Sequence, residues 1–416
     1  MSAVAVHSEA VIRRRNLRFG LFSLLLAAVM LGFFAPGSGG STARFIVDAT
    51  RGGVPPLRVS VFPTVTILGV VVLALAAYML VRGFGERALL VLGLATGLFV
   101  FAFLTWAAAE QSLSLIGLLR STLFSATPIA FGALAGVLGE RAGVINIAIE
   151  GQFLAAAFTG AVVGSVTSSS WIGLLGGIAA GVLIAAMLAG LSITFKADQI
   201  VSGVVLIVFA TGLTSFLTSQ VLSGSAGLNR PPRFGSWAIP GLSEIPVVGP
   251  LLFTATPLTF AMLIAVIWLQ FALFRTRWGL RLRAVGEKPR AADTVGIPVI
   301  PTRWKAVLYG GVLAGMGGAW FTLDSVGSFS REMTGGRGFI ALAALLVGRY
   351  SPLGAFGAAL LFGFATAMAS ALQLLSTGVP SSLLLTIPYI VTIFVVAGLM
   401  GRLRAPAADG QPYEKE

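Results

Sequence analysis

The sequence has no cysteine and a single histidine, His7, among its 416 residues. Disulfide bonds and thiolate metal sites are therefore excluded, and neither an HExxH motif nor a Cys/His zinc cluster can form. A membrane-embedded enzyme would need a nucleophile, a base or a metal site within the bilayer, and this composition argues against one. We expect no metal and no cofactor on this chain, and no enzymatic activity.

A GxxxxGK[ST] motif is also absent. This glycine-rich loop is the phosphate cradle of many ATPases, so the polypeptide is not expected to bind ATP in that way. If ATP hydrolysis drives the protein, ATP and Mg²⁺ must be bound by a separate subunit.

Charged residues are scarce, at 10% of the chain, whereas hydrophobic residues make up 56%. An ordinary soluble domain has about a quarter charged residues, and a bilayer core needs roughly 20 apolar residues per helix. The net charge of +13 would suggest nucleic-acid binding in a soluble protein, but here the basic residues follow the pattern of membrane loops. We predict an all-α polytopic membrane protein, in contact with lipid and not with nucleic acid.

Apolar windows predict about 12 transmembrane segments, within a range of 10–12, with both termini in the cytoplasm. The segments lie near residues 18–35, 62–81, 88–107, 121–138, 149–166, 171–194, 199–220, 251–274, 305–323, 337–350, 352–374 and 383–400. Two stretches are candidates for broken or re-entrant helices, because 132–151 contains polar and charged residues and 337–350 is short.

Cytoplasmic loops retain lysine and arginine, so the basic residues give the orientation. With the N-terminus inside, eight of the 28 basic residues lie outside or at the outer rim, namely Arg44, Arg51, Arg58, Arg120, Arg230, Arg233, Arg331 and Arg337. The other 20 lie inside, and the opposite orientation would invert this bias.

The arginines at 13–15 and 18 resemble the basic start of a signal peptide. The apolar stretch 19–35 is too long for most signal peptides and lacks a clear cleavage pattern, so we interpret it as a retained first helix. Residues 1–110 are expected to form an N-terminal accessory transmembrane region, 111–402 the core and 403–416 a cytoplasmic tail.

Polar residues interrupt the apolar stretch 136–158. Asn146 and Glu150 are four positions apart, which on one helix would place them on a shared face. Such groups line a pathway, or they hold helices together where small neighbours permit close packing. Both interpretations stay open.

The loop 274–305 contains eight basic residues and only two acidic ones, Glu287 and Asp293. Pro289 suits a first helical turn, Gly296 would stop the helix, and Pro298 would prevent it from resuming. A short helix here could dock into a partner, or the loop could be held near anionic lipid.

The segments GERAGVINIAIEG, FKADQIVSGVVLIVFATGLTSF, RAVGEKPRAADTVGI and GSFSREMTGGRGFIALAALLVGRYSPLGAFGAALLFGF occur in this order between residues 115 and 401. Together they resemble the motifs of nucleoside-type ABC importer permeases, within the ribose and branched-chain amino-acid permease group. The resemblance makes 111–402 a permease core. It also implies a cytoplasmic ABC ATPase subunit, a second permease subunit forming a heterodimer, and an extracytoplasmic solute-binding lipoprotein.

By this resemblance, the segment 286–297 would be the coupling helix that enters a cleft on the ATPase. Its coupling residues would be Gly286, Glu287, Pro289, Arg290, Ala292, Asp293 and Gly296. Discontinuous elements would line the translocation path, with candidate residues Asn146, Glu150, Gln152, Ser328, Glu332 and Thr334. Asp324 would be a gate or a packing residue.

The expected function is inward transport of a nucleoside or of a related small polar solute. A purine nucleoside is the first candidate cargo. An ABC permease for a sugar or a branched-chain amino acid is an alternative, because these permeases share one architecture. An ion-coupled secondary transporter is another, since twelve spans are common there and residues 136–143 partly match a Gxxx(D/E)RxG loop. That match lacks the following basic pair, and few carboxylates lie deep in the helices.

Overall fold

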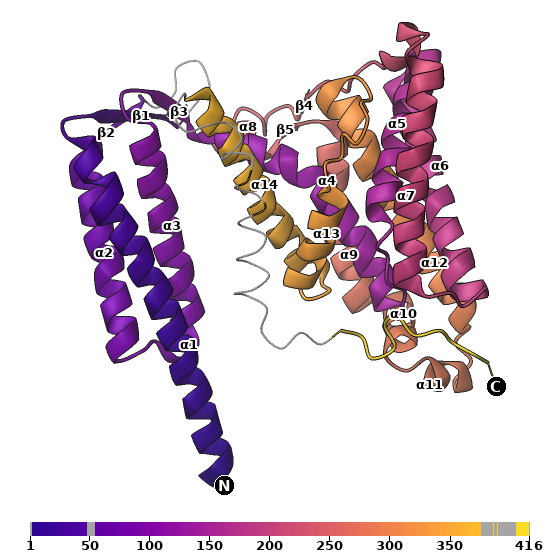
Figure 1. Ribbon diagram of the computed structural model, residues 1–416, viewed down its shortest axis with the longest axis horizontal. Coiled ribbons are helices and arrows are strands. Elements are labelled where there is room, and N and C mark those ends of the chain that lie inside the picture. Colours follow the sequence, from indigo (N-terminus) through magenta and orange to yellow (C-terminus); the bar gives the residue numbers. More distant parts are fainter. Residues whose placement is uncertain (1, 48–54, 376–385, 387–388, 390–404, 416) are drawn as a thin grey trace. The chain divides into compact units, whose positions relative to one another are not determined.

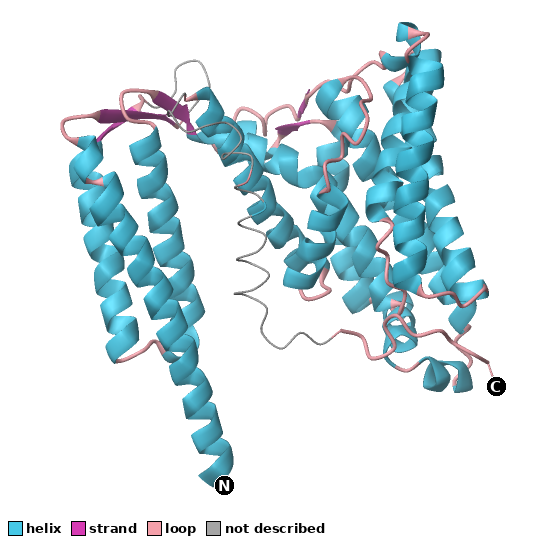
Figure 2. Cartoon of the chain, in the orientation of Figure 1, coloured by secondary structure: helices cyan, strands magenta, loops and turns pink. Residues whose placement is uncertain are grey.

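The computed structural model describes all residues except 1, 48–54, 376–385, 387–388, 390–404 and 416. Long helices make up most of it, and short strands join some of them (Figure 1, Figure 2). The chain divides into two compact units, Met1–Gly117 with Ala371–Val379, and Leu118–Ser370 with Pro380–Glu416.

The first unit contains three long helices and a small sheet. Its elements are α1 (Ser2–Val29, continued by a π-helical turn, Met30–Phe34), β1 (Thr42–Ile46), β2 (Leu57–Ser60), α2 (Val61–Val81), α3 (Ala88–Ala107) and β3 (Ser112–Ser114). Strand β1 is central, antiparallel to β2 and parallel to β3. The ring of Phe34 stacks on Trp106 with 5.0 Å between centroids, which fixes the end of α1 against α3.

The second unit contains the remaining helices. Its elements are α4 (Leu115–Arg141), α5 (Ile149–Thr167), α6 (Ser170–Ala189), α7 (Gln199–Leu217), β4 (Trp237–Ala238), α8 (Val248–Leu252), β5 (Thr254–Ala255), α9 (Pro257–Arg275), α10 (Arg277–Glu287), α11 (Pro289–Thr294), α12 (Val299–Trp320), α13 (Arg337–Val347) and α14 (Pro352–Leu374). Helices α4 and α14 each extend slightly across the division between the units. Strands β4 and β5 pair as a short antiparallel ribbon.

Ten helices in the described part of the chain are long and apolar enough to cross a membrane. They coincide with ten of the twelve predicted segments, and the segment predicted at 337–350 is the short helix α13. The last predicted segment, 383–400, falls almost wholly on residues outside the described ranges. The prediction of a mostly helical protein with many candidate membrane spans is therefore confirmed for the described residues, which also include two small sheets that the sequence did not predict.

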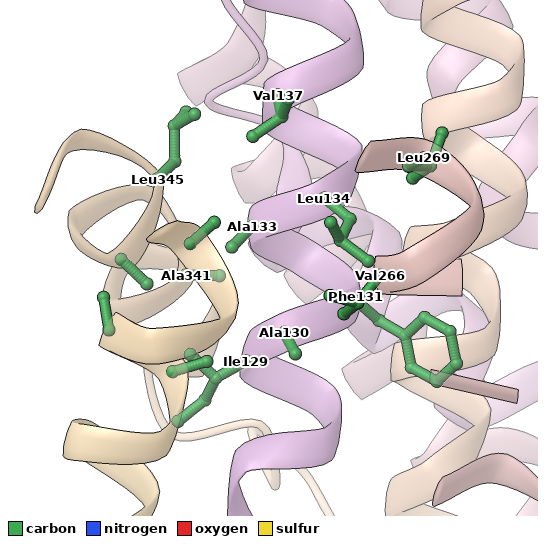
Figure 3. Packing of buried hydrophobic residues seen from close by; sticks show 14 of the residues in the cluster. Ile129, Ala130, Phe131, Ala133, Leu134, Val137, Val266, Leu269, Ala341 and Leu345 are labelled. Atoms are coloured by element: carbon green, nitrogen blue, oxygen red, sulfur yellow. The ribbon is translucent and has the colours of Figure 1, made fainter. Parts of the chain in front are cut away.

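Helix α4 lies at the centre of the second unit. In its most apolar window 89% of the residues are buried, against 28% in the helix that starts at Gln199. Figure 3 shows side chains of α4, among them Phe131 and Leu134, packed between Val266 of α9 and Leu345 of α13. A helix buried on all sides must match its neighbours closely in shape, and its partners are therefore held in fixed positions around it.

Glycines allow α5, α6 and α12 to approach closely. A Cβ added at Gly181 of α6 would lie 2.6 Å from the Cα of Gly315 on α12, closer than atoms tolerate. Without a hydrophobic driving force between helices in lipid, such small-residue contacts are the main source of helix association.

We therefore expect Gly181→Leu to lower the stability of the second unit by about 1–3 kcal/mol or more, because the α6 and α12 backbones must separate. Gly212→Leu on α7 is the matched control, since nothing lies within 4 Å of an added Cβ there. Thermal unfolding in detergent checks both variants, and equal unfolding temperatures would contradict the close approach.

Candidate functional site

The predicted interruption within 132–151 is present. Helix α4 ends at Arg141, and the chain is not helical again until Ile149, where α5 begins. Gly143 has a φ of +85°, and a Cβ there would lie 2.8 Å from Nη2 of Arg303, so a larger residue would not fit. The backbone N–H of Ile145 donates to Oε1 of Gln199 at 2.7 Å, which holds the interrupted segment against the start of α7.

Asn146 lies in this interruption and not on a helix. The prediction that Asn146 and Glu150 share a helical face is therefore wrong, because α4 ends at Arg141, five positions before Asn146, and α5 begins only at Ile149. Asn146 instead donates from Nδ2 to Oε1 of Gln152 at 3.3 Å. Both side chains are buried, and Oδ1 of Asn146 and Nε2 of Gln152 have no partner among the described residues.

The carboxylate of Glu150 caps helix α13. Its Oε1 accepts from Oγ1 of Thr334 at 2.6 Å and from the backbone N–H of Gly336 at 2.9 Å, and its Oε2 accepts from the N–H of Gly338 at 2.6 Å. A helix N-terminus has unpaired N–H groups and a partial positive charge, so an anion is favoured there. Glu150 thus joins two discontinuous helices, α5 and α13, through charge-assisted hydrogen bonds.

Two of the predicted path residues lie apart from this joint. Ser328 is half-buried, and Glu332 is exposed in the turn that precedes α13, with a φ of +55°. The connection is held elsewhere by Asn229, which donates to the carbonyl of Phe329 and accepts from its N–H. The structure therefore brings Glu150 and Thr334 together, and Asn146 with Gln152, without adding Ser328 or Glu332 to either pair.

A chain of hydroxyl groups leads from Asp324 into the helix bundle. Oγ1 of Thr256 donates to Oδ2 of Asp324 at 2.6 Å, and Thr259 lies 3.1 Å from Thr256 and 3.2 Å from Thr127 of α4. Asp324 is buried, and its Oδ1 has no partner in the described part of the chain. Our sequence analysis singled out Asp324 but missed the threonines, because isolated threonines in apolar helices carry no distinctive pattern.

The basic loop forms the predicted short helix. Helix α11 begins at Pro289 and ends at Thr294, and Gly296 follows with a φ of +81°. The N–H groups of Gly296 and Ile297 close the helix on the carbonyls of Asp293 and Ala292. Proline lacks the N–H that would be unpaired in a first turn, and glycine adopts positive φ without strain, so these two residues set the boundaries.

The residues named for coupling fall into two groups in this loop. Gly286 and Ala292 are buried, and a Cβ at Gly286 would overlap the carbonyl oxygen of Arg141. Ala292 packs with Val285, Val299 and Tyr413 in a small apolar cluster. Exposed positions include Glu287, Arg290 and Gly296, while Pro289 and Asp293 are half-buried. The exposed and half-buried positions have surface that another protein can contact directly, and the two buried positions do not.

No group of three or more acidic or histidine side chains able to hold a metal occurs among the described residues. The polar groups described above are instead hydroxyls, amides and the carboxylates of Glu150 and Asp324. This donor set can hydrogen-bond a polar solute.

Comparison with known proteins gives the family. Residues 118–396 match the family described as "Branched-chain amino acid transport system / permease component". The chain is 40% identical over 316 residues to the guanosine ABC transporter permease protein NupQ of Bacillus subtilis (strain 168), covering 73% of this chain and 98% of that protein. It is 39% identical over 307 residues to the nucleoside ABC transporter permease protein NupC of Lactococcus lactis subsp. cremoris (strain MG1363), covering 72% and 96%.

A third relative, the glucose ABC transporter permease protein TsgB13 of Haloferax volcanii, is 28% identical over 288 residues, covering 67% of this chain and 76% of that protein. No solved structure matches the chain. The family match confirms the resemblance drawn from the four motifs. The chain is a multi-pass protein of the bacterial plasma membrane and belongs to the family of branched-chain amino acid transport system permease components, in which it is a transport subunit without catalytic activity of its own.

Proposed function

We propose that the chain is the membrane-spanning subunit of an ATP-driven importer whose cargo is a nucleoside, and that a purine nucleoside is the first candidate. The observation that carries this proposal is the similarity of nearly the whole core to NupQ and NupC, whose names state guanosine and nucleoside transport. The absence of a P-loop motif agrees with hydrolysis on another subunit, where ATP and Mg²⁺ would bind.

The exposed side of α11 is the proposed contact with the ATPase subunit. Ala291, Thr294 and Val295 are exposed, and the side chain of Val295 has 74% of its surface accessible. A short helix with an exposed apolar residue, on a loop rich in arginine, suits a cleft with an apolar floor and an acidic rim. Gly286 and Ala292 would serve coupling from inside the loop by keeping its shape.

The proposed topology has 12 spans with both termini in the cytoplasm. The bias of lysine and arginine supports it, since loop 274–305 alone contains eight basic residues. The described end of the chain supports it as well, because Ala408 donates from its backbone N–H to the carbonyl of Gly286 at 2.9 Å. The basic loop and the C-terminal end therefore lie on one side of the membrane.

The translocation path is proposed to pass the interrupted helices α4–α5 and α13. Asn146 and Gln152 each keep one buried polar atom that has no partner among the residues that the structure describes, which is costly unless something pairs with it for part of the transport cycle. A nucleoside carries several hydrogen-bond donors and acceptors that could do so. Glu150 and Thr334 would hold the two helices in place, and Ser328 and Glu332 would lie at the entrance of the path.

A second permease subunit and an extracytoplasmic solute-binding lipoprotein complete the proposed complex. Two Bacillus subtilis relatives support the heterodimer, because NupQ and the guanosine ABC transporter permease protein NupP, 26% identical to this chain, carry the same activity in their names. Glucose is a second candidate cargo, since TsgB13 is named for it.

The test is uptake of labelled guanosine, adenosine, uridine and glucose by the complex reconstituted in liposomes with its ATPase, its partner permease and its receptor. We expect ATP-dependent uptake of nucleosides and no uptake driven by an ion gradient alone. Uptake of glucose but not nucleosides would replace the cargo, and uphill transport by this chain without an ATPase would overturn the proposal.

A further inference from the structure

The end of the chain, residues 405–415, lies across the basic loop and is termed here the C-terminal strap. Besides the bond from Ala408 to Gly286, the N–H of Ala407 donates to Oε2 of Glu287 at 3.3 Å. The hydroxyl of Tyr413 donates to Oδ2 of Asp293 at 2.8 Å, and its ring belongs to the apolar cluster with Ala292. The C-terminal strap thus holds both ends of α11.

The same eleven-residue segment also contacts the cytoplasmic ends of the transmembrane helices. Arg303 of α12 donates from Nη1 to the carbonyl of Gln411 at 2.8 Å. A Cβ added to Gly410 would lie 2.9 Å from Cδ1 of Ile145. A Cβ added to Gly143 would lie 2.9 Å from the carbonyl oxygen of Ala408. The C-terminal strap therefore touches the interruption between α4 and α5 on one side and α11 on the other.

Charge ties the C-terminal strap to α12 as well. Arg303 is 2% exposed, and a buried guanidinium requires opposite charge and hydrogen-bond acceptors nearby. Within the described residues, the acidic charge that acts on Arg303 is Asp409 of the strap, and the carbonyl of Gln411 is its acceptor. Removing the strap would leave Arg303 without either.

We infer that the C-terminal strap is a positioning element for coupling, which makes α11 and the interruption between α4 and α5 move as one body. This inference rests on the proposed function, because it assigns a mechanical role within an ATP-driven cycle. Without the strap, the loop meets the interruption where Gly286 lies against the carbonyl of Arg141 and where Arg303 lies beside Gly143, and both of these positions are outside α11. A displacement of α11 by the ATPase would then be absorbed in the loop.

Protonation should affect docking of the C-terminal strap. Burial raises the pKa of Asp409 to about 6. The hydrogen bond from the Gly410 N–H and the charge of Arg303 lower this pKa, but by less than burial raises it. Glu140 of α4 and Tyr350 also face Asp409. Glu140 hydrogen-bonds to it. Burial, together with the charges of Glu140 and Asp409, raises the pKa of Tyr350 to about 12. A raised carboxyl pKa means that the docked state binds the proton more tightly than the free state.

Docking should therefore weaken as the pH rises through about 6 and change little above that value. A fluorescent label on Lys415→Cys, in a chain that has no other cysteine, reports strap mobility by anisotropy. We expect lower anisotropy at pH 7.5 than at pH 5, and a flat profile in the Asp409→Asn variant. A wild-type anisotropy that rises with pH would contradict the assignment of Asp409.

The inference is tested in the reconstituted complex with two changes to the C-terminal strap. Truncation after Arg404 removes it, and Tyr413→Phe removes only the hydroxyl that binds Asp293. We expect truncation to lower the nucleoside transported per ATP hydrolysed about fivefold or more, and Tyr413→Phe to lower it by a smaller factor, with ATPase activity retained. Glu414→Gln is the matched control, because its ion pair with Lys196 is exposed and weak.

Docking itself is measured by cross-linking Glu287→Cys to Ala407→Cys in membranes with a thiol-specific bifunctional reagent, against the single-cysteine variants. We expect a cross-link both with and without ATP. The absence of a specific cross-link, or a truncated protein that binds its ATPase and keeps the wild-type ratio, would overturn the inference. A wild-type complex that hydrolyses ATP without any uptake would instead refute the proposed function.

Discussion

Replacing Glu150 with alanine is expected to abolish transport and to destabilise the second unit by about 3 kcal/mol or more, because three buried hydrogen bonds are lost together. The N–H groups of Gly336 and Gly338 would be left without an acceptor at the start of α13, inside a low-dielectric region. Glu150→Gln should have an intermediate effect, since its amide keeps one oxygen but turns an NH₂ group toward a backbone donor.

Thermal unfolding in detergent and nucleoside uptake in liposomes measure these effects. For the alanine variant we expect the unfolding temperature to fall by about 5 °C or more and uptake to fall at least tenfold. Glu332→Gln is the control, because Glu332 lies exposed in the turn that leads into α13 and should change stability by less than about 0.5 kcal/mol. Equal losses of stability in the Glu150 and Glu332 variants would show that the cap on α13 has no special role.

Local rules predicted the short helix in the basic loop well. Pro289 and Gly296 set the ends of α11 through their own backbone preferences, which do not depend on the rest of the fold. The same holds for the ten long helices, where length and hydropathy decide. The short helix α13 was also predictable, since glycines at 335, 336 and 338 interrupt the pattern there.

Contacts between distant segments were not predictable in the same way. Glu150 was singled out for its charge, but its acceptor role depends on Thr334, 184 positions later. Asn146 was placed on a helix because periodicity cannot show that Gly143 takes a positive φ. Besides Tyr413, the C-terminal strap contains alanines, two prolines, a glycine and a few polar or charged residues, so nothing local indicates that it packs on α11.

Val295→Glu is expected to weaken binding of the ATPase subunit at least tenfold, which is the size of effect of a central interface residue. Val295 has 74% of its surface exposed just after α11, where an apolar side chain gains stability only if a partner covers it. A glutamate there would place a charge in a desolvated cleft, and it would also oppose any acidic rim that the arginines of the loop attract.

Co-purification of the ATPase with the tagged permease, and ATP hydrolysis stimulated by the loaded receptor, measure the effect. Val81→Glu is the matched control, because Val81 is also strongly exposed, at 82%, but ends a helix of the first unit. We expect Val295→Glu to lose both readouts while its unfolding temperature stays at the wild-type value, and Val81→Glu to keep both. If Val295→Glu binds and stimulates the ATPase normally, the coupling surface must lie elsewhere on the cytoplasmic side.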